Sequence, residues 1–386
     1  MRSALRASWL FDGTGLRPDP VLVLDGERIA SVEYGASPEG LPVTDLTGAT
    51  LLPGLVDTHV HLAFDSGPAP VASLAARSEA DALAAMAVAA RAALRAGVTT
   101  VRDLGDRDYL ALRLRDTAGP LPTILGAGPP ITTPGGHCHF LGGVAEPGPA
   151  GMRAAVREHA EHGVDVIKIM ASGGHLTEGT HQHQTQFGAE ELAAAVDEAH
   201  RHGLPVTAHA HATQSIVNAL EAGVDGVEHL SFWSADGVDE PPGDIVRTLV
   251  AGPVAVGATL GLRQDPAYPP PPGVVRRVPL MMANLKRLHD EGALICVGTD
   301  AGIGPPKPHG VLPHAVRQLV QIGFDPAQAL RTMTEVGARV CGLGDRKGRL
   351  APGFDADILA VDGDPVTDPE VLHRIRAVYA RGTLVA

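Results

Sequence analysis

Cysteine is scarce in this chain of 386 residues, and no long apolar run occurs in it. The cysteines form no C-x-x-C pair, which argues against a disulfide framework or a zinc ribbon. They lie far apart, at Cys138, Cys296 and Cys341. Because no stretch of eighteen apolar residues is present, we expect no membrane-spanning segment. Residues 1–12 lack the long apolar core of a signal peptide, so we interpret them as a strand.

Basic residues are outnumbered by acidic ones. Lys and Arg together number 31, Asp and Glu number 44, and the net charge is −13 at pH 7. This excess of negative charge argues against nucleic acid and anionic membranes as partners. Hydrophobic residues make up 44% and charged residues 19%, which supports a large buried core rather than disorder. We expect a cytoplasmic enzyme that acts on a small molecule, and we leave a homo-oligomer open.

One pattern recurs along the chain: a helix-like segment ends at a glycine, and an apolar strand follows. Glycine ends helices because it adopts the left-handed conformation without a steric penalty from a Cβ atom. The apolar runs are rich in β-branched residues, as parallel strands buried on both faces are. Strands of this kind are predicted at residues 98–103, 164–168, 204–209, 224–229 and 293–299.

Further strands at residues 55–61, 122–126 and 253–259 complete a set of eight, and helices are predicted at 190–202 and 325–339. Eight strands that alternate with helices favour an α/β fold of the (β/α)₈ TIM-like barrel type. A doubly wound open sheet is the competing architecture. No G-x-G-x-x-G pattern follows the first strand, which weakens that alternative.

The two ends of the chain do not follow the barrel pattern. Both contain short alternating strands, and Asp-Gly pairs at 12–13, 25–26 and 362–363 predict hairpin turns. We predict that residues 1–54 and 345–386 combine into one small β-sandwich domain. The catalytic barrel domain then comprises residues 55–344.

Histidine is abundant, with 18 residues, and several lie where predicted strands end. The carboxyl ends of barrel strands face the active site. His59 and His61 share one side of their strand, and neutral imidazole is the commonest metal ligand. An H-x-H pair alone also fits a hydrogen-bonded surface pair. The other polar residues at strand ends are Lys168, His209, His229 and Asp300.

These residues allow more than one interpretation each. We assign His209 to a metal, and His211, on the same face, to an outer support or a substrate contact. Lys168 cannot ligate a metal as an ammonium, so it is either paired with Asp103 or Glu228 or carbamylated by CO₂ into a bridging carboxylate. Asp300 either binds metal and accepts a proton from bound water, or caps the next helix.

Together these segments resemble the amidohydrolase superfamily over nearly the whole chain. The matching motifs occur in the expected order: LPGLVDTHVH at 52–61, VIKI at 166–169, AHAH at 208–211, VEHL at 227–230, GTDAG at 298–302 and GRLAPGFDAD at 348–357. The resemblance implies a distorted barrel with two divalent metal ions, typically zinc.

The resemblance also implies a role for each matching residue. A hydroxide that bridges the metals attacks a carbonyl carbon, and Asp300 relays its proton to the leaving nitrogen. A carbamate on Lys168 bridges both metals, which favours the two-metal branch over the mononuclear deaminases. The more buried metal is bound by His59, His61 and Asp300, and the more exposed one by His209 and His229.

Within the superfamily the chain is similar to imidazolonepropionase-like and prolidase-like proteins, on the AHAH motif, Ser172-Gly173-Gly174 and Gly135-Gly136-His137. In such relatives the histidine after the third strand contacts a substrate carboxylate, which suggests His137. His175 and Ala212 depart from the usual pattern. We also expect substrate contacts from His175 and His211, whereas His139, His181 and His183 fit either the pocket or a solvated loop.

The expected reaction is hydrolysis of an amide C–N bond in a dipeptide such as Xaa-Pro or in an N-acyl amino acid. Alternatives on the same site are a lactonase or esterase, a cyclic-amide hydrolase, or a decarboxylase. A non-catalytic scaffold is a further alternative, and the complete set of ligand positions argues against it.

Overall fold

The computed structural model describes residues 2–35, 40–117 and 119–386. Each of the eight barrel strands predicted from the sequence is present, and their pairing is parallel within two sheets. One sheet has the order β6-β7-β8, with β6 (Leu55–Val60), β7 (Val98–Asp103) and β8 (Thr123–Gly126). The other has the order β13-β12-β11-β10-β9, with β9 (Ile167–Met170), β10 (Val206–Ala212), β11 (Gly226–Trp233), β12 (Ala255–Thr259) and β13 (Leu294–Gly298).

A few backbone hydrogen bonds connect the two sheets on both sides. Next to β6 and β13, the backbone N–H of Asp300 donates to the oxygen of His59 at 2.7 Å. Next to β8 and β9, the N–H of Asp165 donates to the oxygen of Gly126 at 2.9 Å. The strands therefore follow one another in a barrel-like order, and the fold is α/β. Continuous ladders run only within each sheet, so a fully closed barrel stays a prediction.

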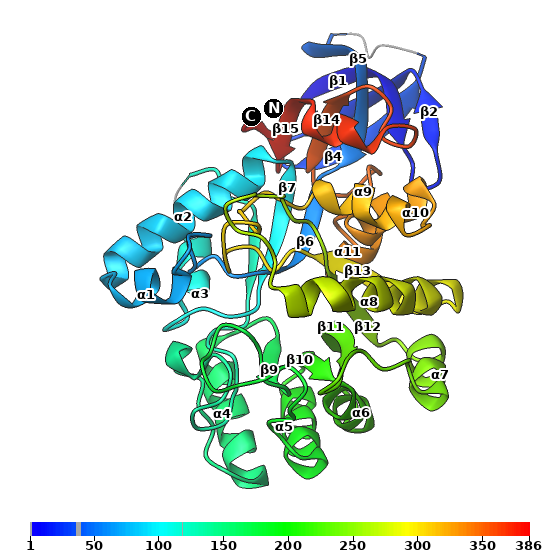
Figure 1. The fold of residues 1–386 in the computed structure, drawn as a ribbon. Coiled ribbons are helices and arrows are strands. Elements are labelled where there is room, and N and C mark those ends of the chain that lie inside the picture. Colours follow the sequence, from blue (N-terminus) through cyan, green and yellow to red (C-terminus); the bar gives the residue numbers. More distant parts are fainter. Residues whose placement is uncertain (1, 36–39, 118) are drawn as a thin grey trace.

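Helices alternate with these strands and cover them on the outside (Figure 1). They are α1 (Pro70–Ala75), α2 (Glu79–Arg95), α3 (Leu110–Arg115), α4 (Pro149–His162), α5 (Ala189–Arg201), α6 (Thr213–Glu221), α7 (Gly243–Ala251), α8 (Pro272–Asp290), α9 (His314–Gln321), α10 (Pro326–Thr332) and α11 (Glu335–Val340), with short 3₁₀ turns η1 (His139–Leu141) and η2 (Pro369–His373). None of the helices in the described ranges has the length and apolarity that crossing a bilayer requires.

The prediction of one helix over 325–339 is wrong at its centre. Asp325 caps α10 as expected, because its side chain accepts from the N–H groups of Ala327 and Gln328. The helix then stops, since Thr334 has φ −127° and ψ −96°, which are not helical. The Thr334 hydroxyl donates to the oxygen of Leu330, and such side-chain bonds compete with helix continuation.

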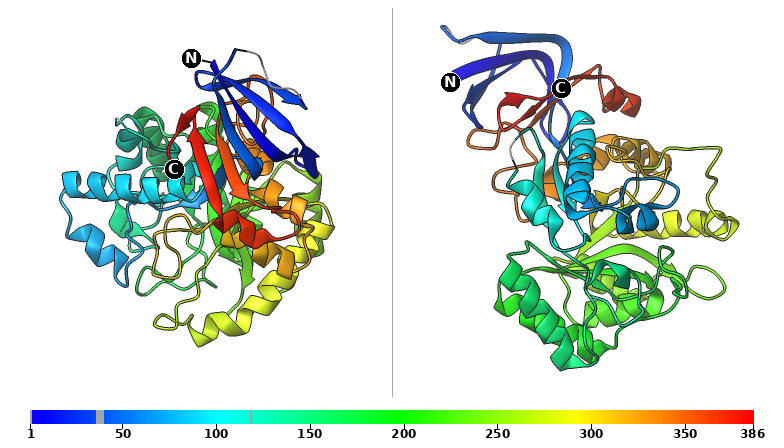
Figure 2. Two further views of the ribbon diagram at one scale, coloured as in Figure 1. Left: turned by 90° about the horizontal axis from the view of Figure 1, so that it is seen from above. Right: turned by 90° about the vertical axis from the view of Figure 1, so that its left-hand side faces the viewer.

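Strands from the two chain ends form one separate sheet, here called the terminal sheet (Figure 2). Its order is β16-β15-β14-β5-β1-β3-β4, and β2 pairs with β1. The antiparallel pairing of β5 with β14 joins the N-terminal to the C-terminal part. The strands are β1 (Arg2–Phe11), β2 (Leu16–Pro18), β3 (Pro20–Asp25), β4 (Arg28–Tyr34), β5 (Val43–Pro53), β14 (Ile358–Asp362), β15 (Ile375–Ala380) and β16 (Thr383–Leu384).

These strands are hydrogen-bonded as a single sheet, so a two-layer sandwich is not confirmed, and the domain limits 1–54, 345–386 and 55–344 remain predictions. The Asp-Gly pairs at 12–13 and 25–26 lie in hairpins, with Gly26 at φ 58° in the turn from β3 to β4. The hairpin predicted at 362–363 is wrong, because η2 lies in the longer connection from β14 to β15.

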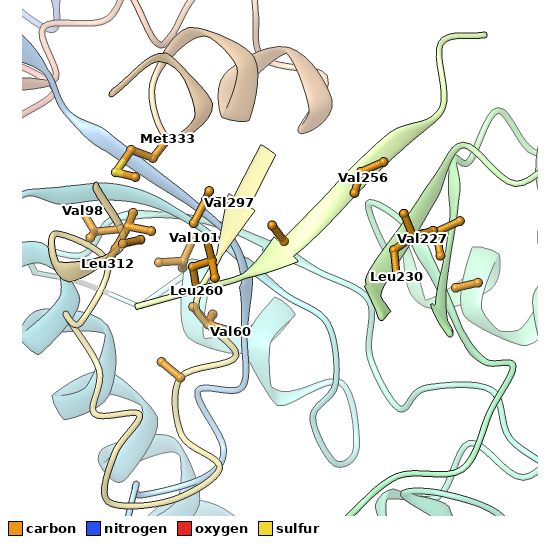
Figure 3. Close-up of a cluster of buried hydrophobic side chains, with 14 of the residues drawn as sticks. Val60, Val98, Val101, Val227, Leu230, Val256, Leu260, Val297, Leu312 and Met333 are labelled. Atoms are coloured by element: carbon orange, nitrogen blue, oxygen red, sulfur yellow. The ribbon is translucent and has the colours of Figure 1, made fainter. Parts of the chain in front are cut away.

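The main hydrophobic core fills the space within and around the parallel strands. Figure 3 shows part of it, with side chains from β6, β7, β11, β12 and β13. One set of residues from the terminal sheet, including Leu52 and Leu359, belongs to this core, and a second set, including Leu51 and Ile358, forms a smaller core of its own. Because neighbouring strand residues point to opposite faces, the terminal sheet packs against the barrel strands with one face.

A buried group of charges lies before β14. The ammonium of Lys347 contacts Asp355 at 2.9 Å and also donates to Asp357, and all three side chains are at most 6% exposed. Arg28 from β4 contacts Asp355 at 2.8 Å, and the N–H of Arg381 donates to Asp357 at 2.8 Å. The group therefore ties the terminal sheet together at several points.

We expect Lys347→Met to lower the free energy of unfolding by about 3 kcal/mol, because it leaves a buried carboxylate without its cation. Urea denaturation followed by circular dichroism measures the change. Lys286→Met is the matched control, since Lys286 forms only a helical i,i+4 pair with Asp290, worth about 0.5 kcal/mol. Equal midpoints for the two variants would contradict this interpretation.

Candidate metal centre

All six residues predicted as metal ligands line one cavity of about 320 Å³ at the carboxyl ends of the parallel strands. His59 lies in β6, Lys168 in β9, His209 in β10 and His229 in β11. His61 directly follows β6, and Asp300 is the second residue after β13. The three expected substrate contacts, His137, His175 and His211, line the same cavity. Of the loop histidines, His139, His181 and His183 are not among the described residues that line it.

Two groups of donor atoms are close enough to hold metal ions. In the first, His59, His61 and Asp300 offer atoms that all lie within 4.8 Å of one another. The Nε2 atoms of His61 and His59 lie 3.2 and 3.6 Å from Oδ1 of Asp300. Asp300 is therefore directed at the histidines. It does not cap the following helix, since α9 begins at His314.

The second group consists of His209, His211 and His229, whose donor atoms meet the same 4.8 Å limit. The His229 ring centroid is 5.2 Å from that of His59, so the two groups adjoin. The expectation that His211 is an outer support or a substrate contact stays a prediction, and the geometry adds a third possible role as a ligand. Its imidazole stacks on His229 with ring centroids 4.4 Å apart and is placed as a ligand would be.

The ring of His59 is oriented by a buried carboxylate. Its Nδ1 donates to Oε2 of Glu228 at 2.9 Å, which leaves Nε2 facing Asp300. Glu228 also accepts from Arg102 at 3.0 Å and from the hydroxyl of Thr207 at 2.8 Å. Such carboxylate partners fix the orientation of metal-binding histidines and raise their basicity. We did not predict this role for Glu228, although a charged residue inside an apolar strand was the signal for it.

Each of the other four histidines is also held by a hydrogen bond at one ring nitrogen. In His209, His211 and His229 the other nitrogen is left for a ligand, whereas Nε2 of His61 faces Asp300 at 3.2 Å. His61 Nδ1 donates to the oxygen of Gly105 at 3.0 Å, and His209 Nε2 donates to that of Gly173 at 3.1 Å. Nδ1 of His229 bonds with Thr259 Oγ1 at 3.0 Å, and Nδ1 of His211 bonds with Ser231 Oγ at 2.7 Å. This arrangement fits imidazoles prepared to bind a cation.

Burial keeps most of these imidazoles neutral, as metal ligands must be. It lowers the pKa of His59 to about 4 and that of His211 to about 3, and it holds those of His209 and His229 well below their usual value. Burial also acts to lower the pKa of His61, but the hydrogen bond with Asp300 outweighs it and raises that pKa.

Asp300 is ionised in this setting. Burial acts to raise its pKa, yet the hydrogen bond from His61 outweighs burial and holds that pKa well below the usual range. The backbone of Asp300 has φ 59° and that of His229 has φ 70°, both in the left-handed region. Such strain is common at functional sites.

Lys168 is 1% exposed, and its Nζ has no hydrogen-bond partner in the described part of the chain. The alternative pairing with Asp103 or Glu228 is not formed. Burial lowers the pKa of Lys168 to about 8. An unpartnered amine costs free energy in a buried site, so the site fits a chemical change that gives this nitrogen partners.

Close packing beneath the centre depends on glycine and on a second buried carboxylate. A Cβ atom at Gly298 would lie 2.3 Å from that of His59, and one at Gly257 would lie 2.2 Å from Oε2 of Glu228. Asp57 accepts from the N–H of Thr299 at 2.9 Å and from its hydroxyl at 2.7 Å. It thereby holds the residue before Asp300.

One wall of the cavity is apolar. On α8, the residues Val274, Val278, Met281 and Met282 line it at helical spacing, and Leu262 and Trp233 extend the wall. His175 meets Trp233 edge-on, with ring centroids 5.9 Å apart. His137 is buried beside His209, and its Nδ1 has no hydrogen-bond partner among the described residues. The cavity thus combines a polar floor with an apolar side.

Known proteins are similar to this chain in sequence and in fold. The sequence is 28% identical over 370 residues to an ochratoxinase from Aspergillus niger, covering 85% of this chain and 73% of that one. It is 27% identical over 400 residues to an imidazolonepropionase from Paracoccus denitrificans, covering 91% and 89%. A crystal structure of a Xaa-Pro dipeptidase with bound methionine matches with a TM-score of 0.86 and 27% identity, covering 100% and 99%.

The sequence pattern of the amidohydrolase family matches residues 50–385. The segments that carry the candidate ligands all fall within this range, as does the C-terminal part of the terminal sheet. Through its sequence pattern and its hydrolase relatives, this chain is a hydrolase of carbon–nitrogen bonds that belongs to the amidohydrolase family.

Proposed function

We propose that the protein is a binuclear-metal amidohydrolase that cleaves the amide bond of a dipeptide or an N-acyl amino acid. The observation that carries this proposal is the presence of two adjoining donor groups in one cavity that also contains the unpartnered amine of Lys168. Zinc is the metal we expect, because the donor atoms are imidazole nitrogens and a carboxylate.

In this proposal, His59, His61 and Asp300 hold one cation, and His209 and His229 hold the other, with His211 within reach. Lys168 would react with CO₂: its neutral nitrogen forms an N–C bond and releases a proton, and the product is a carbamate whose oxygens would be available to the cations. Because burial lowers the pKa of Lys168 to about 8, more of the amine is neutral near pH 7 than for an exposed lysine.

When bound, the cations supply Lewis-acid chemistry, which polarises a carbonyl and makes water more acidic. Asp300 accepts the proton of the attacking water and passes it to the leaving nitrogen. Water adds to the carbonyl carbon, the C–N bond breaks, and a carboxylic acid and an amine leave. The ionised state of Asp300 suits it to accept that proton.

The relatives support an amide substrate, since an ochratoxinase and a Xaa-Pro dipeptidase are among them. The apolar wall on α8 suits an apolar group of such a substrate. Hydrolysis of a cyclic amide is a second candidate, and the similarity to imidazolonepropionase favours it.

We expect Asp300→Asn to lower kcat by about 10²- to 10⁴-fold, because the amide cannot accept the proton of the attacking water. Amine release is measured over a panel of dipeptides and N-acyl amino acids with zinc-loaded protein. Asp236→Asn, in an exposed loop after β11, is the matched control and keeps wild-type rates. Full activity in Asp300→Asn would contradict the role assigned to this residue. If the wild type turns over no member of the panel, cyclic amides become the proposed substrates.

Glu228→Gln is expected to weaken the binding of one metal ion by about 10- to 100-fold, since His59 loses the carboxylate that orients it. Competition with a chromophoric chelator gives the affinity. Glu221→Gln, at the exposed end of α6, serves as the control. Unchanged affinity in Glu228→Gln would show that the carboxylate acts on folding alone.

Lys168→Met should bind fewer metal ions than the wild type, for which we expect about two per chain. The variant lacks the nitrogen that forms the carbamate, so no bridge is available between the two donor groups. Elemental analysis of protein purified in zinc gives the metal content, and native mass spectrometry detects bound CO₂. Equal metal content in variant and wild type would refute the bridging role.

A further inference from the structure

Lys307 lines the cavity, and no role has been assigned to it so far. It lies in the loop that follows β13, and its side chain is partly buried. Its Nζ donates to the backbone oxygen of Thr299 at 2.7 Å and to that of Thr259 at 3.2 Å. The ammonium is thereby held between the carboxyl ends of β12 and β13. An ammonium has three N–H donors, so one remains for a further partner.

The hydrogen-bond partners of Lys307 are both neutral carbonyl groups. The charges of Asp300 and Asp57 act on it from farther away, but neither carboxylate forms an ion pair with it within the described ranges. A partly buried ammonium with only neutral partners gains free energy from an additional anionic one. An anion that enters the cavity can supply it. The side chain is thus anchored in place at the cavity lining, and two of its three N–H donors have acceptors among the described residues.

The other charged residues that line the cavity indicate which cation can bind an anionic group of the substrate. Among the described lining residues, the lysines are Lys168 and Lys307, and arginine is absent. In the proposed function, Lys168 forms the carbamate that serves the metal ions, so it is not available to a substrate. Asp300 already contacts His59 and His61. Lys307 is therefore the cation available to a substrate.

We propose that Lys307 binds the free carboxylate of the substrate, so that the enzyme prefers amides with a carboxylate on the amine side over their neutral analogues. This inference rests on the proposed amide hydrolysis. It makes Lys307 a specificity residue and leaves the apolar wall on α8 for an uncharged part of the same substrate. Neutral aryl amides and ureas are then poor substrates.

The test compares matched pairs, such as N-acetyl-L-leucine and N-acetyl-L-leucinamide, chosen for the best acyl amino acid of the panel. Release of the amine product gives kcat/KM for each member. In the wild type we expect the acid to be preferred by about 10- to 100-fold, the range of one charge-assisted hydrogen bond. The preference is expected mainly in KM.

Lys307→Gln keeps donors for the two backbone oxygens and removes the charge. Its preference should fall to about one, whereas Lys307→Arg should retain most of it. Lys286→Gln, in α8 but not among the residues that line the cavity, is the control with wild-type preference. A role of Lys307 in folding alone would lower both rates together and leave their ratio unchanged, so the ratio separates the two explanations.

If the wild type cleaves both members of a pair equally well, or if Lys307→Gln keeps the preference for the acid, the inference is overturned and the proposed function stands. A wild-type ratio near one overturns the inference even when a variant fails to fold. If the wild type cleaves no member of any pair, the proposed amide hydrolysis fails, and the role of Lys307 fails with it.

Discussion

The buried carboxylate of Glu228 is the contact on which the candidate centre depends. From β11 it reaches His59 of β6, Arg102 of β7 and Thr207 of β10, so it connects the two parallel sheets beneath the cavity. A buried carboxylate is costly unless its oxygens are satisfied, and each oxygen of Glu228 has a partner. The same contacts therefore hold the two sheets together and orient a ligand.

Around this carboxylate, the floor of the cavity is formed by largely buried side chains and is rich in imidazole. Burial keeps His59, His209, His211 and His229 neutral, and contacts with histidines keep Asp300 ionised. These protonation states are the ones that metal ligands require. They follow from where the rings are buried and not from any property of the isolated residues, so the chemistry of the centre is a product of packing.

Much of the fold and the site could be predicted from particular residues. The glycines at helix ends and the apolar runs after them located the eight parallel strands, because those runs must be buried on both faces. The residues at the ends of these strands then had to meet, since parallel strands share one carboxyl edge. Errors arose where a local signal competed with another one: Thr334 interrupts the helix predicted at 325–339, and Asp362-Gly363 begins a long connection rather than a hairpin.

The sequence by itself determined the parallel α/β pattern, the pairing of the chain ends as β-structure, and the histidines, lysine and aspartate that face the cavity, because periodicity and strand ends are local properties. Tertiary structure alone decided that His211 joins His209 and His229, that Glu228 supports His59, and that Lys307 is anchored beside the cavity without an anionic partner. The physical reason is distance: these contacts join residues from different strands, and their separation in space depends on how the sheets twist and pack rather than on spacing along the chain.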